Sequence, residues 1–346
     1  MPDWSKRKRL EATIAGELPD RPPIAIWRHW PGDDQRADSL AAAHLKWQID
    51  YDWDLIKVSP ASSFAISDWG VKDRWVGSIE GTREYTHRAV NEPGDWESLR
   101  PLDPNKGMLA TQLETLRMVV SAAGESIPVV GTIFSPLAQA KNIAGPEKIL
   151  SHMRSHPASF HRGLETILAS TLRYLDEARK TGISGMFYAV QQARYPLMNH
   201  EEFAAFGRAY DLRLLADMQD LWLNMTHIHG TDIMFDSVAD YPVQFVNWHD
   251  RETSVSIAEG LKQIPGAASG GVSRWSLHQE SPERALAEAS EAVSATSGRR
   301  LMLGTGCVAM ITSPTSNIRA LREAVDTLKY SQRRQARLTP PFPYSK

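Results

Sequence analysis

The chain has 346 residues, of which 42% are hydrophobic and 23% charged, and its formal net charge is −2. This balance gives no overall basic field, so we expect neither nucleic acid nor an anionic membrane as a partner. A single cysteine excludes an internal disulfide, and no apolar run approaches the roughly 20 residues of a membrane span. The N-terminus also lacks the apolar stretch of a signal peptide. We therefore expect a cytoplasmic protein that acts on a small molecule.

Short apolar runs alternate with longer amphipathic stretches. A first helix is predicted over 4–16, and strands are predicted at 22–30, 54–59, 129–134, 184–190, 221–227, 243–249, 266–272 and 300–306. Helices are predicted at 39–50, 107–123, 145–180, 199–219, 254–264, 281–296 and 315–330. Eight strands alternating with helices favour one α/β domain, a single (β/α)8 TIM barrel over residues 1–346. A doubly wound open sheet is the alternative.

Three segments lie outside this alternation. Residues 60–106 follow the second strand and are too long for an ordinary connection, and the alternation in "GTREYTHRAV" predicts a hairpin there. We interpret this inserted segment as a lid in which Trp69, Trp75 and Tyr85 face the barrel mouth or pack against the barrel. The helix over 4–16 is expected to cover the opposite end. The proline-rich tail 338–346 is predicted to be extended.

Polar residues gather where the predicted strands end, which is where a barrel places its active site. They are Arg28, His29, Ser59, Gln191, Gln192, His227, His229, His249, Asp250, Arg274 and Cys307. Because residues two apart on a strand share a face, the side chains of His227 and His229 could bind the same ligand.

The only cysteine, Cys307, follows a glycine-rich strand end and precedes a helix start, where amide groups would stabilise a thiolate. Two imidazoles and a thiolate make a three-ligand zinc site with an open fourth position, so His227, His229 and Cys307 are predicted metal ligands. A Cys–His nucleophile is the rival reading. A third hypothesis is that these histidines and Cys307 are buried for structural reasons and have no chemical role.

Several stretches resemble the uroporphyrinogen decarboxylase-like superfamily, and in particular its zinc-dependent methyltransferase branch. They are "KRLEATIAGELPDRPPIAIWRHW", "PVVGTIFSPLAQA" and "LMLGTGCVAMITSPTSNIRALREAV". This branch includes the methylcobamide:coenzyme M methyltransferases, which bind zinc through a His-x-Cys pair followed by glycine and through a later cysteine. "HIHG" matches that pair with His229 in place of the first cysteine, and Cys307 matches the last.

The decarboxylase branch of the superfamily fits less well. Arg28 falls on the first arginine of its paired-arginine loop, but Gly32 stands where the second would be. Its aspartate after the second strand is replaced around Ser59 and Pro60, and Asn142 occupies the place of a tyrosine. The comparison therefore disfavours decarboxylation of a porphyrinogen.

The resemblance implies a methyltransferase that holds one zinc per chain and activates a thiol or other soft nucleophile. A methyl-corrinoid or tetrahydrofolate would be the co-substrate, and a corrinoid protein a possible partner. Arg28, Gln191, Gln192 and His249 are the predicted catalytic or substrate-contacting residues, with His249 or Asp250 orienting a metal ligand. The alternatives are a metal-free carboxy-lyase that anchors its substrate through Arg28, and a non-catalytic barrel that binds a corrinoid or tetrapyrrole.

Overall fold

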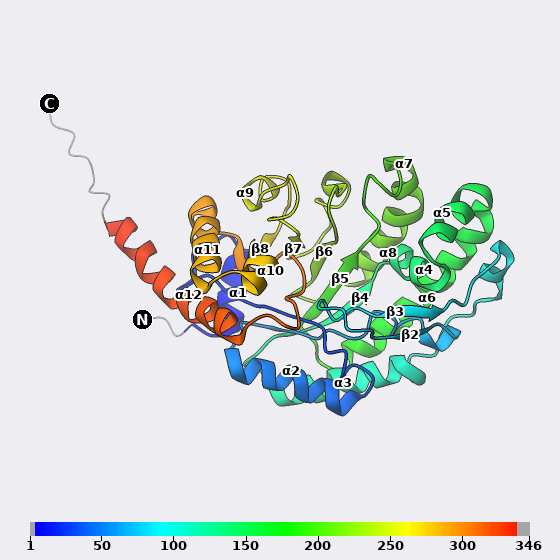
Figure 1. Ribbon diagram of the computed structural model, residues 1–346, viewed down its shortest axis with the longest axis horizontal. Helices are drawn as coiled ribbons and strands as arrows, with labels where there is room; N and C mark the ends of the chain where they lie inside the picture. The colour runs from blue at the N-terminus through cyan, green and yellow to red at the C-terminus, as the bar shows by residue number, and fades with distance from the viewer. Residues whose placement is uncertain (1–3, 338–346) are drawn as a thin grey trace.

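A curled parallel sheet of seven strands forms the centre of the computed structural model, which describes residues 4–337 (Figure 1). The predicted tail 338–346 lies outside the described residues. The strands, in sheet order, are β1 (Ile56–Lys57), β4 (Val129–Phe134), β5 (Gly185–Val190), β6 (Met225–Ile228), β7 (Phe245–Trp248), β8 (Ala267–Val272) and β9 (Leu301–Thr305). This order follows the chain without a reversal, as in a TIM-like fold and unlike a doubly wound sheet. Seven of the eight predicted strands are confirmed.

The prediction of a strand over 22–30 is wrong. This segment makes one parallel bridge, between Ile24 and Leu303 of β9. The Ala25 amide donates to Leu303 O at 3.1 Å, and Ile24 O accepts from the Asp54 amide at 3.0 Å. The segment thus lies between β9 and β1, in the position of an eighth strand. Because Pro22 and Pro23 have no N–H group, the hydrogen-bond ladder cannot extend toward the start of the segment.

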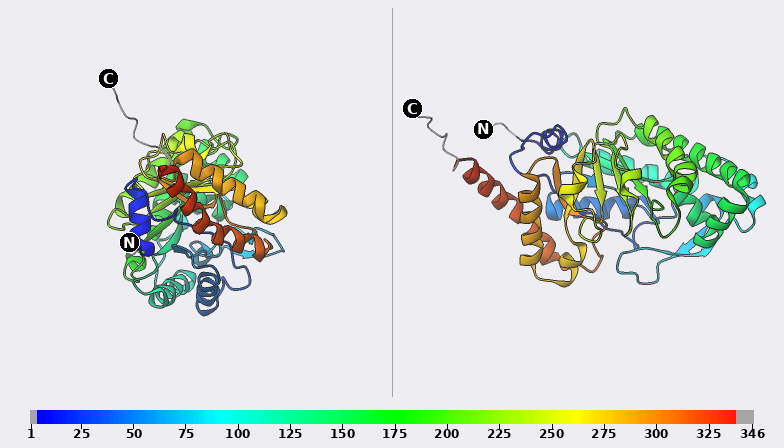
Figure 2. Two further views of the ribbon diagram at one scale, coloured as in Figure 1. Left: turned by 90° about the vertical axis from the view of Figure 1, so that its left-hand side faces the viewer. Right: turned by 90° about the horizontal axis from the view of Figure 1, so that it is seen from above.

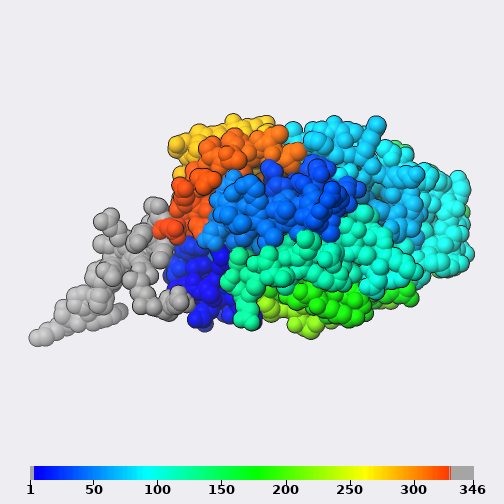
Figure 3. Space-filling view, turned by 90° about the horizontal axis from the view of Figure 1, so that it is seen from below, coloured from blue at the N-terminus to red at the C-terminus, as the bar shows by residue number. Residues whose placement is uncertain are grey.

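Helices surround the sheet (Figure 1). They are α1 (Lys6–Ile14), α2 (Ala37–Tyr51), α3 (Gly107–Ala123), α4 (Pro136–Ala144), α5 (Pro146–Ser155), α6 (Pro157–Arg179), α7 (His200–Phe203), α8 (Ala209–Asp217), α9 (Ile257–Gly260), α10 (Arg274–Gln279), α11 (Pro282–Thr296) and α12 (Thr315–Arg337). Figure 3 shows α2 in blue and α3 in teal side by side. The single helix predicted over 145–180 is two helices that meet at His156, and α4 and α10 were not predicted. Among the described residues, no helix combines the length and hydropathy that crossing a membrane requires.

Helix α1 is tied to the start of β1 by buried ion pairs. Asp54, which is fully buried, accepts from Arg9 Nη1 and from Arg21 Nη1, each at 2.7 Å, and from the Ile24 amide at 2.8 Å. Arg9 also pairs with Asp20. Helices α1 and α12 lie at the same end of the molecule (Figure 2). One carboxylate thus joins α1, the segment before Ile24 and the first strand.

The inserted segment 60–106 contains the predicted hairpin. Strands β2 (Lys72–Arg74) and β3 (Glu84–His87) pair antiparallel, and we call residues 75–83 between them the hairpin loop. Arg83 holds this loop to the segment before α2 because its guanidinium pairs with Asp34, and it also pairs with Asp73 of β2. The Ile311 amide, which follows β9, donates to Ile79 O at 2.7 Å. The loop is therefore docked against segments that leave the C-terminal ends of the strands.

Candidate functional site

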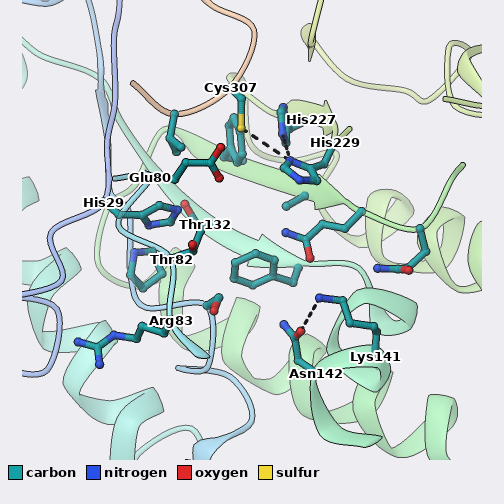
Figure 4. A pocket seen from close by; sticks show the side chains of 18 of the residues that line it. His29, Glu80, Thr82, Arg83, Thr132, Lys141, Asn142, His227, His229 and Cys307 are labelled. Atoms are coloured by element: carbon teal, nitrogen blue, oxygen red, sulfur yellow. Dashed lines mark hydrogen bonds between the residues drawn. The ribbon is translucent and has the colours of Figure 1, made fainter. Parts of the chain in front are cut away.

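Three histidines and the only cysteine meet at the C-terminal ends of β6, β7 and β9. His229 Nδ1 lies 3.4 Å from His227 Nε2, 3.4 Å from His249 Nε2 and 3.7 Å from Cys307 Sγ. The four donor atoms all lie within 4.8 Å of one another, and we call these residues the His–Cys cluster. Figure 4 shows His227, His229 and Cys307 side by side at one end of a cavity.

The register between β6 and β7 brings Asn247 beside His227. His227 in β6 is paired with Asn247 in β7, and His227 Nδ1 lies 2.6 Å from Asn247 Oδ1. The Asn247 amide nitrogen donates to Ser269 O at 2.8 Å and to Thr305 O at 3.1 Å, which fixes the direction of the side chain. Because Oδ1 can only accept, His227 carries its proton on Nδ1 and turns the Nε2 lone pair toward the cluster.

A glycine allows β7 and β9 to approach closely enough for Cys307 to reach His249. A Cβ atom on Gly306 would lie 2.5 Å from Trp248 O and 2.8 Å from His249 Cα. Only glycine fits between these strand ends without a shift of the backbone. The glycines before Cys307 thus have a packing role as well as forming a turn.

His249 has a carboxylate behind it. Its Nδ1 lies 3.2 Å from Glu252 Oε1, so Nδ1 donates and Nε2 is left free to face His229. The sequence predicts that His249 orients a metal ligand, whereas in the structure its Nε2 lies beside His229 Nδ1, among the donor atoms of the cluster. Asp250 does not contact His249 and instead accepts from the Gly271 amide at 3.1 Å.

The donor geometry fits a metal ion. A tetrahedral zinc with bonds of about 2.0–2.1 Å to nitrogen and about 2.3 Å to sulfur has ligand–ligand edges of roughly 3.3–3.6 Å. The distances of 3.4, 3.4 and 3.7 Å from His229 Nδ1 are close to these edges. One imidazole nitrogen can satisfy only one hydrogen bond, so hydrogen bonding alone does not account for three donors gathered around it.

The electrostatics of the cluster favour a thiolate. Burial alone would raise the pKa of Cys307, but the neighbouring imidazoles, led by His227, hold that pKa well below its usual value. Burial opposes the charged form of His249, yet Cys307 and Glu252 raise the pKa of His249 to about 9. Burial lowers the pKa of His227. A thiolate is the form in which cysteine binds metals, whereas His249, with a pKa of about 9, would release a proton on binding an ion.

The His–Cys cluster opens into a cavity of about 360 Å³, a size that suits a small molecule. Trp27, Phe134 and Phe187 supply apolar wall, and the rings of Phe187 and His227 stack with centroids 5.4 Å apart. Residues of the inserted segment also line it, namely Pro60, Ser62, Glu80, Thr82, Arg83 and Tyr85. The inserted segment therefore contributes to the same cavity as His227, while its role as a lid stays a prediction.

The cavity is rich in positive charge. Lys57 is only 6% exposed, and its Nζ donates to Ser59 Oγ at 3.1 Å and lies 4.4 Å from the centre of the Phe187 ring. Burial lowers the pKa of Lys57 to about 7 and that of Lys141 to about 8. Within residues 4–337, Lys57, Lys141 and Arg194 form no ion pair with a carboxylate. Such a cavity suits an anionic ligand.

The structure brings most, though not all, of the predicted residues together. Gln191 and Gln192 line the cavity with His227, His229 and Cys307. Arg28 does not: its Nη1 donates to Ile311 O at 2.9 Å, and its guanidinium lies over the Trp30 ring. Because residues 22–30 leave the sheet after one bridge, position along the chain did not predict where this side chain points.

The aromatic residues predicted to face the barrel mouth divide in the same way. Tyr85 lines the cavity. Trp69 instead donates to Arg100 O at 2.8 Å, and Trp75 is exposed and donates to Ser78 O at 3.1 Å. Residues of the site that the sequence analysis does not name include Lys57 and Glu252. A lysine inside the apolar run "DLIKVS" was a signal for the first, whereas nothing local marks the second.

Comparison with known proteins shows the family of this chain. The family profile described as "Uroporphyrinogen decarboxylase (URO-D)" matches residues 75–328, more than half of the chain. The methylcobamide:CoM methyltransferase MtbA of Methanosarcina acetivorans is 19% identical over 95% of this chain and 100% of its own length.

Two solved structures show the same fold. A methyltransferase from Methanosarcina mazei superposes with a TM-score of 0.83 at 17% identity, over 94% of this chain and 99% of that one. A B12-independent methionine synthase from Shewanella sp. W3-18-1 gives a TM-score of 0.59 at 13% identity, over 94% and 98% of the two chains.

Proposed function

Because the chain belongs to the uroporphyrinogen decarboxylase family, we propose that it is a methyltransferase of that family and that the His–Cys cluster is its zinc site. The observation that carries this proposal is the convergence of His227, His249 and Cys307 on His229 Nδ1. The relatives described as methyltransferases support it at the level of reaction class. His249 joins the three ligands expected from the sequence.

In this proposal each residue has a separate task. His227, His229, His249 and Cys307 would hold the ion, and a substrate thiol would bind it as an additional, fifth ligand, which would lower the pKa of the thiol and keep it as a thiolate. Asn247 and Glu252 fix the imidazole tautomers. Gln191 and Gln192 offer amide groups to the substrate from the end of β5. The methyl donor would be a methyl-corrinoid, on its own carrier protein, or a methylated tetrahydrofolate.

The cavity also indicates the kind of acceptor. Lys57, Lys141 and Arg194 lack carboxylate partners among the described residues, and Lys57 lies beside Phe187, whose ring stacks on His227. A small thiol that carries a carboxylate or sulfonate would place its sulfur at the cluster and its charge at Lys57. We therefore propose an anionic thiol as the acceptor.

Metal content and methyl transfer test the proposal together. The purified protein should contain about one zinc per chain, and Cys307→Ala and His249→Ala should lose most of it while His161→Ala, a histidine of α6 bonded to Tyr210, keeps it. The zinc-loaded protein should transfer the methyl group of methylcobalamin to 3-mercaptopropionate, seen as loss of the methylcobalamin absorbance. Full zinc content in both cluster variants would refute the site.

The family leaves one other reaction open, a metal-free decarboxylation, and the unpaired cations of the cavity could hold carboxylates for it. Arg28, the expected anchor for that reaction, lies outside the cavity. Release of carbon dioxide from a carboxylated substrate by Cys307→Ala at the wild-type rate would favour this alternative.

A further inference from the structure

A series of connected ion pairs joins the hairpin loop to Nδ1 of His249, the ring nitrogen that faces away from the cluster. Glu80 of the loop accepts from Arg274 Nη1 at 2.7 Å. Arg274 Nε donates to Glu252 Oε1 at 3.0 Å, and that same oxygen accepts from His249 Nδ1 at 3.2 Å. His249 and Glu252 lie in one loop, and folding has brought Arg274 and Glu80 to them from two other segments.

Arg274, at the centre of this series, restricts the movement of the Glu252 side chain. Arg274 is buried at the start of α10, and its guanidinium meets Glu252 along one edge and Glu80 at the remaining nitrogen. A second donor, Trp275 Nε1, lies 3.2 Å from Glu252 Oε2. Glu252 therefore has both oxygens fixed, and it cannot turn away from His249 without breaking several hydrogen bonds.

The hairpin loop is attached to the barrel by a small number of polar contacts. Between β2 and β3 it is held to the barrel through Glu80, Arg83 and the carbonyl of Ile79. The same loop presents exposed apolar side chains, Trp75, Val76 and Ile79. Its own two-stranded sheet is not part of the central sheet, so the loop can leave the barrel at the cost of a few polar contacts.

We propose that Glu252 is a positioning residue for His249, and that Arg274 couples it to Glu80, so that docking of the hairpin loop and binding of a metal at the His–Cys cluster favour each other. This inference rests on the proposed function. Docking completes the charge balance around Arg274, which holds Glu252 toward Nδ1 and directs Nε2 to the ion. An ion that needs Nε2 in turn holds the loop, because such coupling is reciprocal.

Metal affinity with a probe ion is the first test. Wild type and variants would be titrated with Co²⁺, whose visible absorption reports the number and kind of ligands. Glu252→Ala should weaken binding about 10–100-fold and shift the spectrum, since partners of metal-bound histidines contribute at that level. Glu252→Gln, which keeps an acceptor for Nδ1, should recover part of the affinity. Glu97→Gln, which removes a surface carboxylate of the same inserted segment, is the matched control.

Coupling is tested by combining variants and by proteolysis of the loop. Glu80→Gln should weaken Co²⁺ binding several-fold in wild type but have little effect in Glu252→Ala. Bound Co²⁺ should protect the hairpin loop from cleavage in wild type and fail to do so in Arg274→Met. Thermal melting of each metal-free variant shows whether it is folded, and Glu252→Gln serves if Glu252→Ala is not.

The outcomes separate this inference from the proposed function. Absence of Co²⁺ binding by folded wild type would refute the metal site itself. If Glu252→Ala and Glu80→Gln bind Co²⁺ as tightly as the control Glu97→Gln, the positioning role is overturned and the metal site stands. The coupling would be overturned if the loss of Co²⁺ affinity in the double variant equalled the product of the losses in the Glu80 and Glu252 single variants.

Discussion

Lys57 shows how one side chain can be unfavourable for the fold and useful for the site. Its ammonium is buried on β1 beside an aromatic ring, and burial lowers its pKa to about 7. Charged groups in such surroundings are costly unless paired, and no carboxylate in residues 4–337 pairs with this one. In the proposed function, an anionic thiol would supply the missing partner.

Replacing Lys57 should therefore discriminate between acceptors by charge. In Lys57→Met we expect the KM for 3-mercaptopropionate to rise about tenfold, as for one lost charge-assisted hydrogen bond, and the KM for neutral 2-mercaptoethanol to stay unchanged. Initial rates with both thiols measure this. An equal change for the two thiols would show that Lys57 shapes the cavity without binding the anion.

At the level of elements, the contact between β7 and β9 decides the geometry of the cluster. In Gly306→Ala the added methyl would meet Trp248 O and His249 Cα, so the two strand ends should separate. We expect zinc affinity to fall at least about tenfold and the free energy of unfolding by roughly 1–3 kcal/mol. Competition with a zinc chelator and urea denaturation measure the two. Gly94→Ala, with open space around the glycine, should change neither.

The anchoring of α1 makes a separate prediction, about stability alone. Asp54→Ala leaves the buried guanidiniums of Arg9 and Arg21 without this carboxylate, which should cost roughly 3–5 kcal/mol of unfolding free energy. Asp50→Ala breaks only a surface pair with Lys46 and should cost under about 1 kcal/mol. Urea denaturation compares the two, and equal losses would mean that the buried network contributes little.

The sequence predicts elements whose signal is local, and it misses those whose cause is distant. β4 was predicted to the residue because "VVGTIF" is a buried apolar run, and the spacing of His227 and His229 pointed to a shared partner. The segment 22–30 has the same apolar character but makes one bridge, and its prolines prevent a ladder toward its start. Glu252 had no sequence signal, because its role depends on Arg274 and on a loop from another part of the chain.

Across the whole molecule, one buried carboxylate should make stability depend on pH. Asp211 of α8 accepts from Tyr188 of β5 at 2.6 Å and from Tyr241 at 2.7 Å, and burial raises its pKa to about 6 from an ordinary value near 3.8. The folded state thus binds this proton more tightly than the unfolded state. Its contribution is complete below about pH 4 and is lost as the pH rises through about 6.

Asp211→Asn should remove this part of the pH dependence. We expect the difference in unfolding free energy between the variant and wild type to change by up to about 3 kcal/mol between pH 4 and pH 7. Urea denaturation at a series of pH values measures it. A constant difference over this range would show that Asp211 titrates normally in the folded protein.

The presence of one cysteine in the whole chain has a consequence for handling the protein in air. The neighbouring imidazoles lower the pKa of Cys307 and so favour its thiolate, the form that attacks peroxide, and Cys307 is the one side chain of the cluster that oxidises readily. The chain has no second thiol that could convert a sulfenic acid at Cys307 to a disulfide. Further oxidation to the irreversible sulfinic acid is therefore not prevented by another residue of the chain. Anaerobic purification, or an added small thiol, would then decide whether the isolated protein is competent or permanently damaged.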